Sequence, residues 1–186
     1  EGEIRLDDVD IRATPLPTLR ARISYLPKED DLFQGTLREN VAYGARDPGS
    51  VGDDAIHRAL KLAGMDEDIA RFATGIDTEL NQVANNLSKG QRRRLSLARV
   101  LMREPGLLIL DEPFEGVSPA ERGQINAAIK RLGDIATLIV THDYDVLKGV
   151  DQVIVLEHIG GPQSVARTTE TACLMVELER SDVKLV

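Results

Sequence analysis

The apolar residues of this chain occur in two patterns: short continuous runs and stretches with helical spacing. Residues 107–110 (Leu-Leu-Ile-Leu) are a continuous run, as are residues 138–140 within a strand predicted over 137–141, as expected of buried parallel strands. Residues 152–157 also read as a strand, and a helix is predicted over residues 119–132. Strands that alternate with helices in this order predict an α/β fold with a parallel sheet.

The segments nearest the two ends of the chain have weaker patterns. Residues 3–6 and 23–26 are predicted strands, joined by a polar segment that contains two prolines. Residues 144–149 are predicted as a short helix. Residues 170–178 fit either a helix or a strand, and this alternative stays open.

The middle of the chain has a helical pattern. Thr36 is suited to cap a helix, and Gly64 is suited to end one. The helices predicted here cover residues 37–43, 53–63 and 66–73, and loops cover residues 45–52 and 76–86. We therefore expect a helical subdomain, residues 28–103, inserted into an α/β core that is made of residues 1–27 and 104–186.

One stretch, residues 87–113, combines a helix and a strand with chemically active ends. Ser88 is a good helix N-cap, and the leucines, arginines and alanine after it favour a helix. Glu-Pro-Gly at 104–106 stops that helix, because proline disfavours a helical residue before it and glycine permits a turn. Asp111 and Glu112 then follow the apolar strand at its C-terminal end, the edge where open α/β sheets bind their ligands.

Composition narrows the class of protein. The 186 residues suit one domain with a small insertion, and a core built mainly from aliphatic side chains is expected, since there is no tryptophan. The net charge of −8 argues against a general nucleic-acid binder, which needs a basic surface. The only cysteine, Cys173, excludes an internal disulfide. No apolar run approaches the ~20 residues that span a bilayer, so we expect any membrane link to run through a partner.

The segment from Ser88 to Gln91 has two interpretations. It is either an ordinary N-cap followed by a helix, or a phosphate site, because free backbone N–H groups and the helix dipole favour an anion. Gly90 would let the backbone approach a phosphate with no Cβ in the way. The three arginines at 92–94 are predicted to form a solvated helix face with no catalytic role.

The acidic pair at 111–112 also has two interpretations. The two residues either merely close a strand, or form a site in which Asp111 serves Mg²⁺ and Glu112 polarises an attacking water. His142 follows the apolar run at 137–141, and therefore lies at the same predicted sheet edge, within reach of a terminal phosphate. His57 and His158 lack such a context and are interpreted as structural or surface residues.

Taken together, these segments resemble the ATP-binding cassette (ABC) ATPases. LSKGQ at 87–91 is similar to the signature loop of that family, LLILDEP at 107–113 to its Walker B strand, and Thr-His-Asp at 141–143 to its switch histidine. Residues 23–40 resemble the Q-loop region of exporter-type cassettes, and the order and spacing match across roughly residues 2–158. The resemblance implies a P-loop NTPase-like parallel sheet with an inserted α-helical signature subdomain.

The resemblance also implies a role for each candidate residue. The positions assigned to ATP of an opposite subunit are Ser88, Lys89, Gly90 and Gln91. Asp111 would serve Mg²⁺ through water, Glu112 the hydrolytic water, and His142 the γ-phosphate. ATP would be held between two cassettes, whose closure would move an attached membrane domain.

Three positions depart from the family's pattern. Lys28 occupies the position of the Q-loop glutamine, and a lysine cannot supply that amide's acceptor oxygen. Ser118 occupies the position of the D-loop aspartate, and Lys89 that of the first signature glycine. Hydrolysis is therefore expected to be slow or asymmetric, although Glu112 and His142 are retained.

The sequence also contains no GxxxxGK[ST] motif, which would supply the N–H cradle and the lysine that hold the β- and γ-phosphates. In the family this P-loop precedes the segment that corresponds to Glu1. We therefore expect a fragment, or a chain whose earlier part is absent; a protein that natively begins here is the alternative. Because it has no P-loop, this chain is expected to be inactive alone.

The preferred hypothesis is a large part of an exporter-type ABC transporter ATPase domain. Its expected ligands are ATP and Mg²⁺. Its expected partners are a second cassette, in a homo- or heterodimer, and a transmembrane domain at the cytoplasmic face of a membrane; no nucleic acid is expected. One alternative is a non-catalytic, cassette-like module that regulates a P-loop-containing partner, favoured by Lys28 and Ser118. Another is a soluble ABC protein that acts on DNA or ribosomes, which the acidic charge disfavours.

Overall fold

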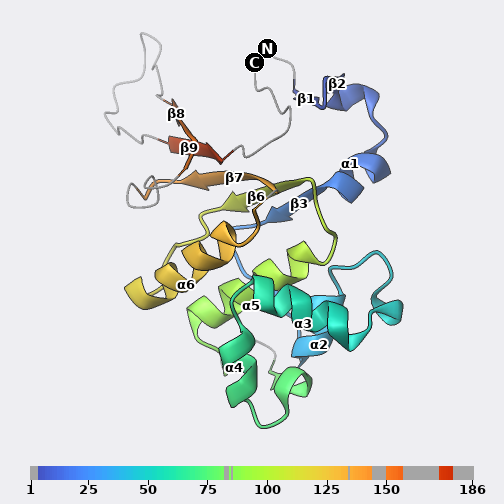
Figure 1. The fold of residues 1–186 in the computed structure, drawn as a ribbon, viewed down its shortest axis with the longest axis vertical. Helices are drawn as coiled ribbons and strands as arrows, with labels where there is room; N and C mark the ends of the chain where they lie inside the picture. The colour runs from blue at the N-terminus through green and yellow to red at the C-terminus, as the bar shows by residue number, and fades with distance from the viewer. Residues whose placement is uncertain are drawn as a thin grey trace, which may run out of the picture.

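A five-stranded sheet forms the centre of the fold, in a computed structural model that describes residues 4–81, 84, 86–133, 135–143, 150–156 and 172–177. Its strands lie in the order β3-β6-β7-β9-β8 (Figure 1). Their bounds are β3 Ile23–Leu26, β6 Leu107–Asp111, β7 Ala136–Thr141, β9 Ala172–Glu177 and β8 Gln152–Leu156. The predicted α/β fold is confirmed.

The sheet has the predicted parallel core, to which antiparallel pairs are added. β3 pairs in parallel with β6, and β6 pairs in parallel with β7. β9 lies between β7 and β8 and runs antiparallel to both. Residues 172–177, which the sequence left as helix or strand, are therefore a strand. The predicted short helix at 144–149 lies outside the described residues.

Helices α2 to α6 gather on one side of this sheet (Figure 1). The α-helices are α1 Leu16–Arg22, α2 Leu37–Ala42, α3 Asp53–Leu62, α4 Asp66–Arg71, α5 Lys89–Leu101 and α6 Pro119–Lys130. The short 3₁₀ helices are η1 Ile11–Ala13, η2 Pro48–Ser50 and η3 Gly75–Asp77. α2, α5 and α6 each begin at a capping box, in which a Thr or Ser hydroxyl accepts from the third helical N–H and that residue's side chain accepts from the cap N–H.

β1 Arg5–Leu6 pairs with β2 Val9–Asp10, and β4 Gly35–Thr36 pairs with β5 Glu79–Leu80, inside a predicted loop. Strand β1 agrees with the strand predicted over residues 3–6, whereas its partner β2, the ribbon of β4 and β5 and helix α1 were not predicted. α1 occupies the segment that the two prolines marked as irregular. Both prolines lie at its beginning, Pro15 at the N-cap and Pro17 in the first turn, where a missing N–H costs no helical hydrogen bond.

A continuous aliphatic core joins the sheet to the helices. Leu108 and Leu110 of β6 are completely buried, as are Ile56 of α3 and Leu95 of α5. The core also contains Phe114, just after the strand that carries the acidic pair. Packing of Leu108 and Leu110 against the helices therefore fixes the position of β6, and with it that of the carboxylates at its end.

Candidate functional site

The ends of β6 and β7 bring the acidic pair and the candidate histidine to one edge. Asp111 is in register with Val140, and the Glu112 N–H donates to the Val140 carbonyl at 2.8 Å. Because the strands are parallel, the residues that follow them, Glu112 and His142, emerge side by side. The sheet edge predicted from the sequence is thus the place where these side chains meet.

Glu112 is held by three donors. Its Oε1 lies 2.7 Å from His142 Nδ1 and accepts from the His142 backbone N–H at 3.1 Å. Its Oε2 accepts from the Thr141 hydroxyl at 3.1 Å. The hydrogen bond to Glu112, and then its charge, raise the pKa of His142 above the ordinary value of 6.5. The two side chains therefore form one hydrogen-bonded pair.

The backbone of Glu112 adopts an uncommon conformation. Its φ of +44° lies in the left-handed region, which residues other than glycine seldom occupy. In this conformation its carboxylate lies against Thr141 and His142. Strain of this kind persists where the surrounding structure over-determines it, and it clusters at functional sites.

Asp111 has a single protein donor to its side chain among the described residues. The Tyr25 hydroxyl donates to Oδ2 at 2.7 Å, and this bond raises the pKa of Tyr25. The described residues contain no group of three or more His, Cys, Asp or Glu arranged to hold a metal. One carboxylate with few protein ligands nearby fits Mg²⁺, which binds to one or two carboxylates and completes its shell with water and phosphate.

Arg93 corrects the prediction that residues 92–94 form a solvated face. Its side chain is buried, with 3% of the side-chain surface exposed. The guanidinium donates to the carbonyl of Asp111 at 2.5 Å, to that of Pro113 at 3.3 Å, and to that of Pro27. Arg93 therefore ties the acidic pair's backbone to the segment at the Q-loop position.

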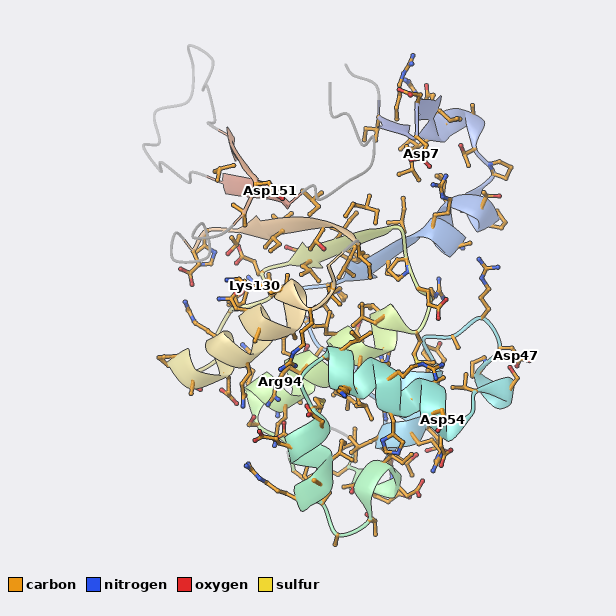
Figure 2. The ribbon with its side chains drawn as sticks, viewed as in Figure 1. Asp7, Asp47, Asp54, Arg94, Lys130 and Asp151 are labelled. Carbon is orange, nitrogen blue, oxygen red and sulfur yellow. The ribbon has the colours of Figure 1, made fainter. Side chains whose placement is uncertain are left out.

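Arg94 is also buried (Figure 2), with 3% of its side-chain surface exposed. It donates to Asp68 Oδ2 at 2.7 Å and to the Gly64 carbonyl at 2.6 Å. The sequence carried a signal that the prediction missed: on α5 the positions 90, 93, 94, 97, 98 and 101 are all buried and follow helical spacing. Two arginines lie on the apolar stripe because α4 and the strand ends supply their acceptors.

Lys28, at the Q-loop position, reaches the loop that follows the acidic pair. Its Nζ lies 2.8 Å from Glu115 Oε2. The hydrogen bond to Glu115 raises the pKa of Lys28, with smaller contributions from the charges of Glu112 and Asp111. Lys28 therefore places a positive charge near the two candidate carboxylates.

The loop at 87–91 forms the N-terminus of α5. The Ser88 hydroxyl accepts from the Gln91 N–H at 3.0 Å, and the Ser88 N–H donates to Gln91 Oε1 at 2.9 Å. Gln91 Nε2 donates to Asp68 at 2.9 Å, which links this loop to α4. The side chain of Lys89 lies over Gly116, where an added Cβ would be 2.3 Å from Lys89 Nζ.

Glu121 of α6 completes this cluster, and the sequence reading did not assign it a role. Its Oε1 accepts from the Ser88 hydroxyl at 2.5 Å and from the Gly90 N–H at 3.2 Å. Its Oε2 accepts from the hydroxyl of Ser118 at 2.7 Å and from its N–H at 3.0 Å. The capping-box spacing of Ser118 and Glu121 was a readable signal for the second pair of bonds, but not for the first.

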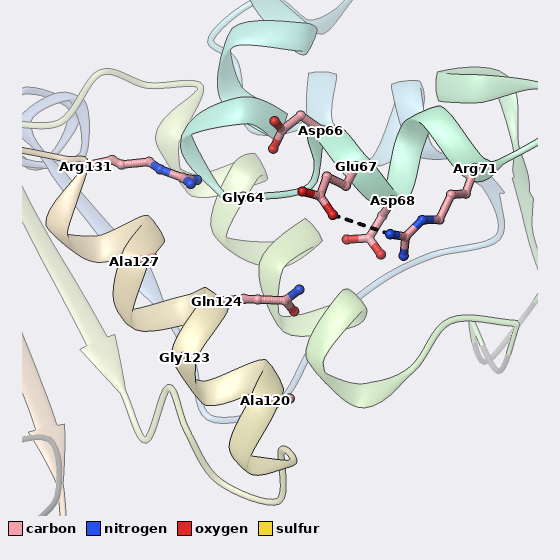
Figure 3. Close-up of a pocket in the computed structure, with 10 residues that line it drawn as sticks. All are labelled: Gly64, Asp66, Glu67, Asp68, Arg71, Ala120, Gly123, Gln124, Ala127 and Arg131. Atoms are coloured by element: carbon pink, nitrogen blue, oxygen red, sulfur yellow. Dashed lines mark hydrogen bonds and ion pairs between the residues drawn. The ribbon is translucent and has the colours of Figure 1, made fainter.

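The described part of the protein also contains a pocket of about 300 Å³ between α4 and α6 (Figure 3). It is lined by Gly64, Asp66, Glu67, Asp68, Arg71, Ala120, Gly123, Gln124, Ala127 and Arg131. Several of its charged groups neutralise one another or a neighbour, as Glu67 does with Arg71. It contains none of the residues predicted to contact nucleotide, so the candidate site is the sheet edge and the α5 N-terminus.

A sheet with parallel central strands, with acidic residues at a strand end and a capped helix nearby, is an architecture typical of P-loop NTPase-like, nucleotide-binding proteins. The sequence matches the ABC transporter family over residues 1–115, more than half of its 186 residues. The chain belongs to this family.

Relatives and a solved structure agree with this assignment. The chain is 33% identical over 161 residues to the uncharacterized ABC transporter ATP-binding protein YwjA of Bacillus subtilis, covering 86% of this chain and 28% of that protein. It is 33% identical over 158 residues to the ATP-dependent lipid A-core flippase of Ralstonia nicotianae, covering 84% and 27%. A bacterial Atm1-family ABC exporter solved with ATP bound superposes with a TM-score of 0.72 at 27% identity, over 83% of this chain and 27% of the exporter.

The chain therefore spans about a quarter of the length of these relatives. In the described residues, every helix is too short or too polar to traverse a bilayer.

Proposed function

We propose that this chain is part of an ATP-hydrolysing cassette that sandwiches MgATP with a second cassette and powers transport across a membrane. Residues 1–27 and 104–186 would belong to the ATPase core, and residues 28–103 to the helical subdomain. The observation that carries the proposal is the pair of Glu112 and His142 at the strand ends, next to Asp111. The partners would be a second cassette and a transmembrane domain, which would hold the chain at the cytoplasmic face.

Glu112 would be the general base. Its carboxylate is fixed by Thr141 and His142, so it can accept a proton from an adjacent water without reorganising. His142 would steady that carboxylate through Nδ1 and present its other ring nitrogen to the γ-phosphate. Asp111, positioned by Tyr25, would serve Mg²⁺. The positive charge of that ion would offset the negative charge of the phosphates.

Ser88, Lys89, Gly90 and Gln91 would contact the ATP that the opposite cassette holds. Lys28 and Ser118, at the Q-loop and D-loop positions, would lower the rate of ATP hydrolysis or make it asymmetric. Lys28 is paired with Glu115, and its ammonium has no acceptor atom for a water or a metal. We expect turnover by the complete protein, and none by these 186 residues alone, because they contain no P-loop motif.

The test is the Glu112→Gln substitution in the complete protein. We expect the steady-state rate of ATP hydrolysis to fall at least ~100-fold, the usual contribution of a general base, with MgATP affinity preserved. Glu67→Gln, which removes an exposed charge on α4, is the control and should leave the rate unchanged. An unaltered rate in the Glu112→Gln protein would show that another group is the base.

A second candidate function is a non-catalytic module that regulates a P-loop-containing cassette. The ion pair between Lys28 and Glu115 favours it, because it places an ammonium where a glutamine would serve metal and water. This alternative predicts ATP-dependent association with a partner, and a hydrolysis rate that Glu112→Gln does not change.

A further inference from the structure

The carboxylate of Glu121 accepts from the Ser88 hydroxyl and the Gly90 N–H, two groups that the proposed function assigns to ATP. Ser88 has one hydroxyl proton. Its Oγ accepts from the Gln91 N–H, and its proton is donated to Glu121 Oε1, 2.5 Å away. The Gly90 N–H is also directed at that oxygen, at 3.2 Å. Neither proton can serve a phosphate while Glu121 stays in place.

The side chain of Glu121 packs closely against the backbone of Gly90. A Cβ added at Gly90 would lie 2.5–2.6 Å from Glu121 Cδ, Cγ and Cβ, so glycine at this position is required by the side chain of Glu121. Bonds from Ser88 and Ser118 lower the pKa of Glu121 to about 2. The group is consequently an anion at physiological pH, and it lies at the N-termini of two helices, α5 and α6, whose dipoles favour an anion there.

Ser118 makes this arrangement possible. Its hydroxyl donates to Glu121 Oε2 at 2.7 Å, whereas an ionised aspartate at the same position could only accept and would repel the carboxylate. The departure from the D-loop aspartate and the position of Glu121 are thus two parts of one feature.

We propose that Glu121 is an internal gate on the signature loop: its carboxylate stands in for the γ-phosphate in the open cassette and must leave when ATP of the opposite cassette arrives. This inference rests on the proposed function, because it takes Ser88 and Gly90 to be phosphate donors. Glu121 is only partly buried, so rotation of its own side chain is sufficient to free both protons. The gate raises the nucleotide concentration at which the two cassettes close.

The experiment measures cassette closure in the complete protein, by energy transfer between fluorophores on the two cassettes, as a non-hydrolysable ATP analogue is titrated with Mg²⁺. Glu121→Gln keeps the shape of the side chain and removes its charge. We expect the half-maximal analogue concentration to fall roughly three- to tenfold, because a charge-assisted hydrogen bond no longer competes with the phosphate.

Glu39→Gln is the matched control. Glu39 is the third residue of α2 and makes the same capping box with Thr36, far from the signature loop in sequence. Glu39→Gln should leave the half-maximal concentration of the ATP analogue unchanged. If Glu121→Gln unfolds, Glu121→Asp replaces it, since a side chain one methylene shorter cannot span both N-caps, and the same fall is expected.

Ser88→Ala separates the two ideas. If it raises the half-maximal concentration while Glu121→Gln leaves it unchanged or raises it too, Glu121 is a structural brace and the gate is wrong, whereas the proposed function stands. If Ser88→Ala has no effect on closure, the signature loop does not contact phosphate, and both proposals fail.

Discussion

The pKa of His142 depends mainly on its neighbour Glu112. Its hydrogen bond to Glu112 raises its pKa, so protonated His142 is favoured by folding. The stabilisation from this pair is then complete below the unfolded value near 6.5 and is lost as the pH rises through the raised folded value. The pH profile of any His142-dependent step should shift in the same direction.

We predict that the pKa of His142, measured by NMR titration of its ring protons, lies above 6.5 in the wild-type protein and falls in Glu112→Gln. The control is Glu67→Gln on α4, which should leave the pKa of His142 unchanged. A pKa of His142 that is unaffected by Glu112→Gln would mean that the two side chains are not paired in solution.

Single residues also mark the limit of prediction from sequence. Ser88 as a helix cap and the acidic pair at a strand end were predictable, because both depend on neighbours within a few positions. The contacts of Glu121 with Ser88 and of Tyr25 with Asp111 join residues far apart in the chain, and their chemistry alone does not reveal them. The catalytic and binding roles themselves stay predictions.

At the scale of elements, α5 is tied to the end of β6 by Arg93. Its guanidinium serves several backbone carbonyls in a buried site, including those of Asp111 and Pro113. Removing it leaves those acceptors buried without donors, which costs more than the net value of the bonds.

We therefore predict that Arg93→Ala lowers the free energy of unfolding by about 3 kcal/mol, measured by chemical denaturation of the complete protein. Arg58→Ala, at an exposed position of α3, is the control and should change it by less than about 0.5 kcal/mol. Equal effects of the two substitutions would show that Arg93 is solvated, as the sequence pattern first indicated.

The contact between α5 and α6 predicts opposite signs for two glycine substitutions. Gly90→Ala should destabilise by about 1–3 kcal/mol, because the new Cβ would meet Glu121 at 2.6 Å or less. Gly123→Ala, within α6, meets nothing within 4 Å and should stabilise by about 0.5–1 kcal/mol through helix propensity. Thermal unfolding of both variants tests the pair; stabilisation by Gly90→Ala would contradict the packing of Glu121.

Elements with local signals were predicted well, and the exceptions have a common cause. The capped helices α2, α5 and α6 and the apolar strands β6 and β7 follow from neighbouring residues. The antiparallel pairing of β9 and the burial of Arg93 depend on tertiary contacts, which local spacing does not encode. α1 was missed because its prolines suggested an irregular segment, although a first turn tolerates them.

At the scale of the whole molecule, the candidate site falls into two separate groups. Asp111, Glu112 and His142 lie at the strand ends, and Ser88 and Gly90 lie at the start of α5. Across the described ranges, no hydrogen bond or ion pair joins a residue of one group to a residue of the other. This separation is what the proposed ATP site between two cassettes requires.

The central claim is that ATP lies between the Glu112 group of one cassette and the Ser88 group of another. The most direct measurement is a structure of the complete protein carrying Glu112→Gln, solved with MgATP. The account predicts a γ-phosphate bound by Ser88 and Gly90 of the opposite cassette, residue 112 and His142 on its other side, and Glu121 turned away. ATP bound while Ser88 and Gly90 still donate to Glu121 would contradict it.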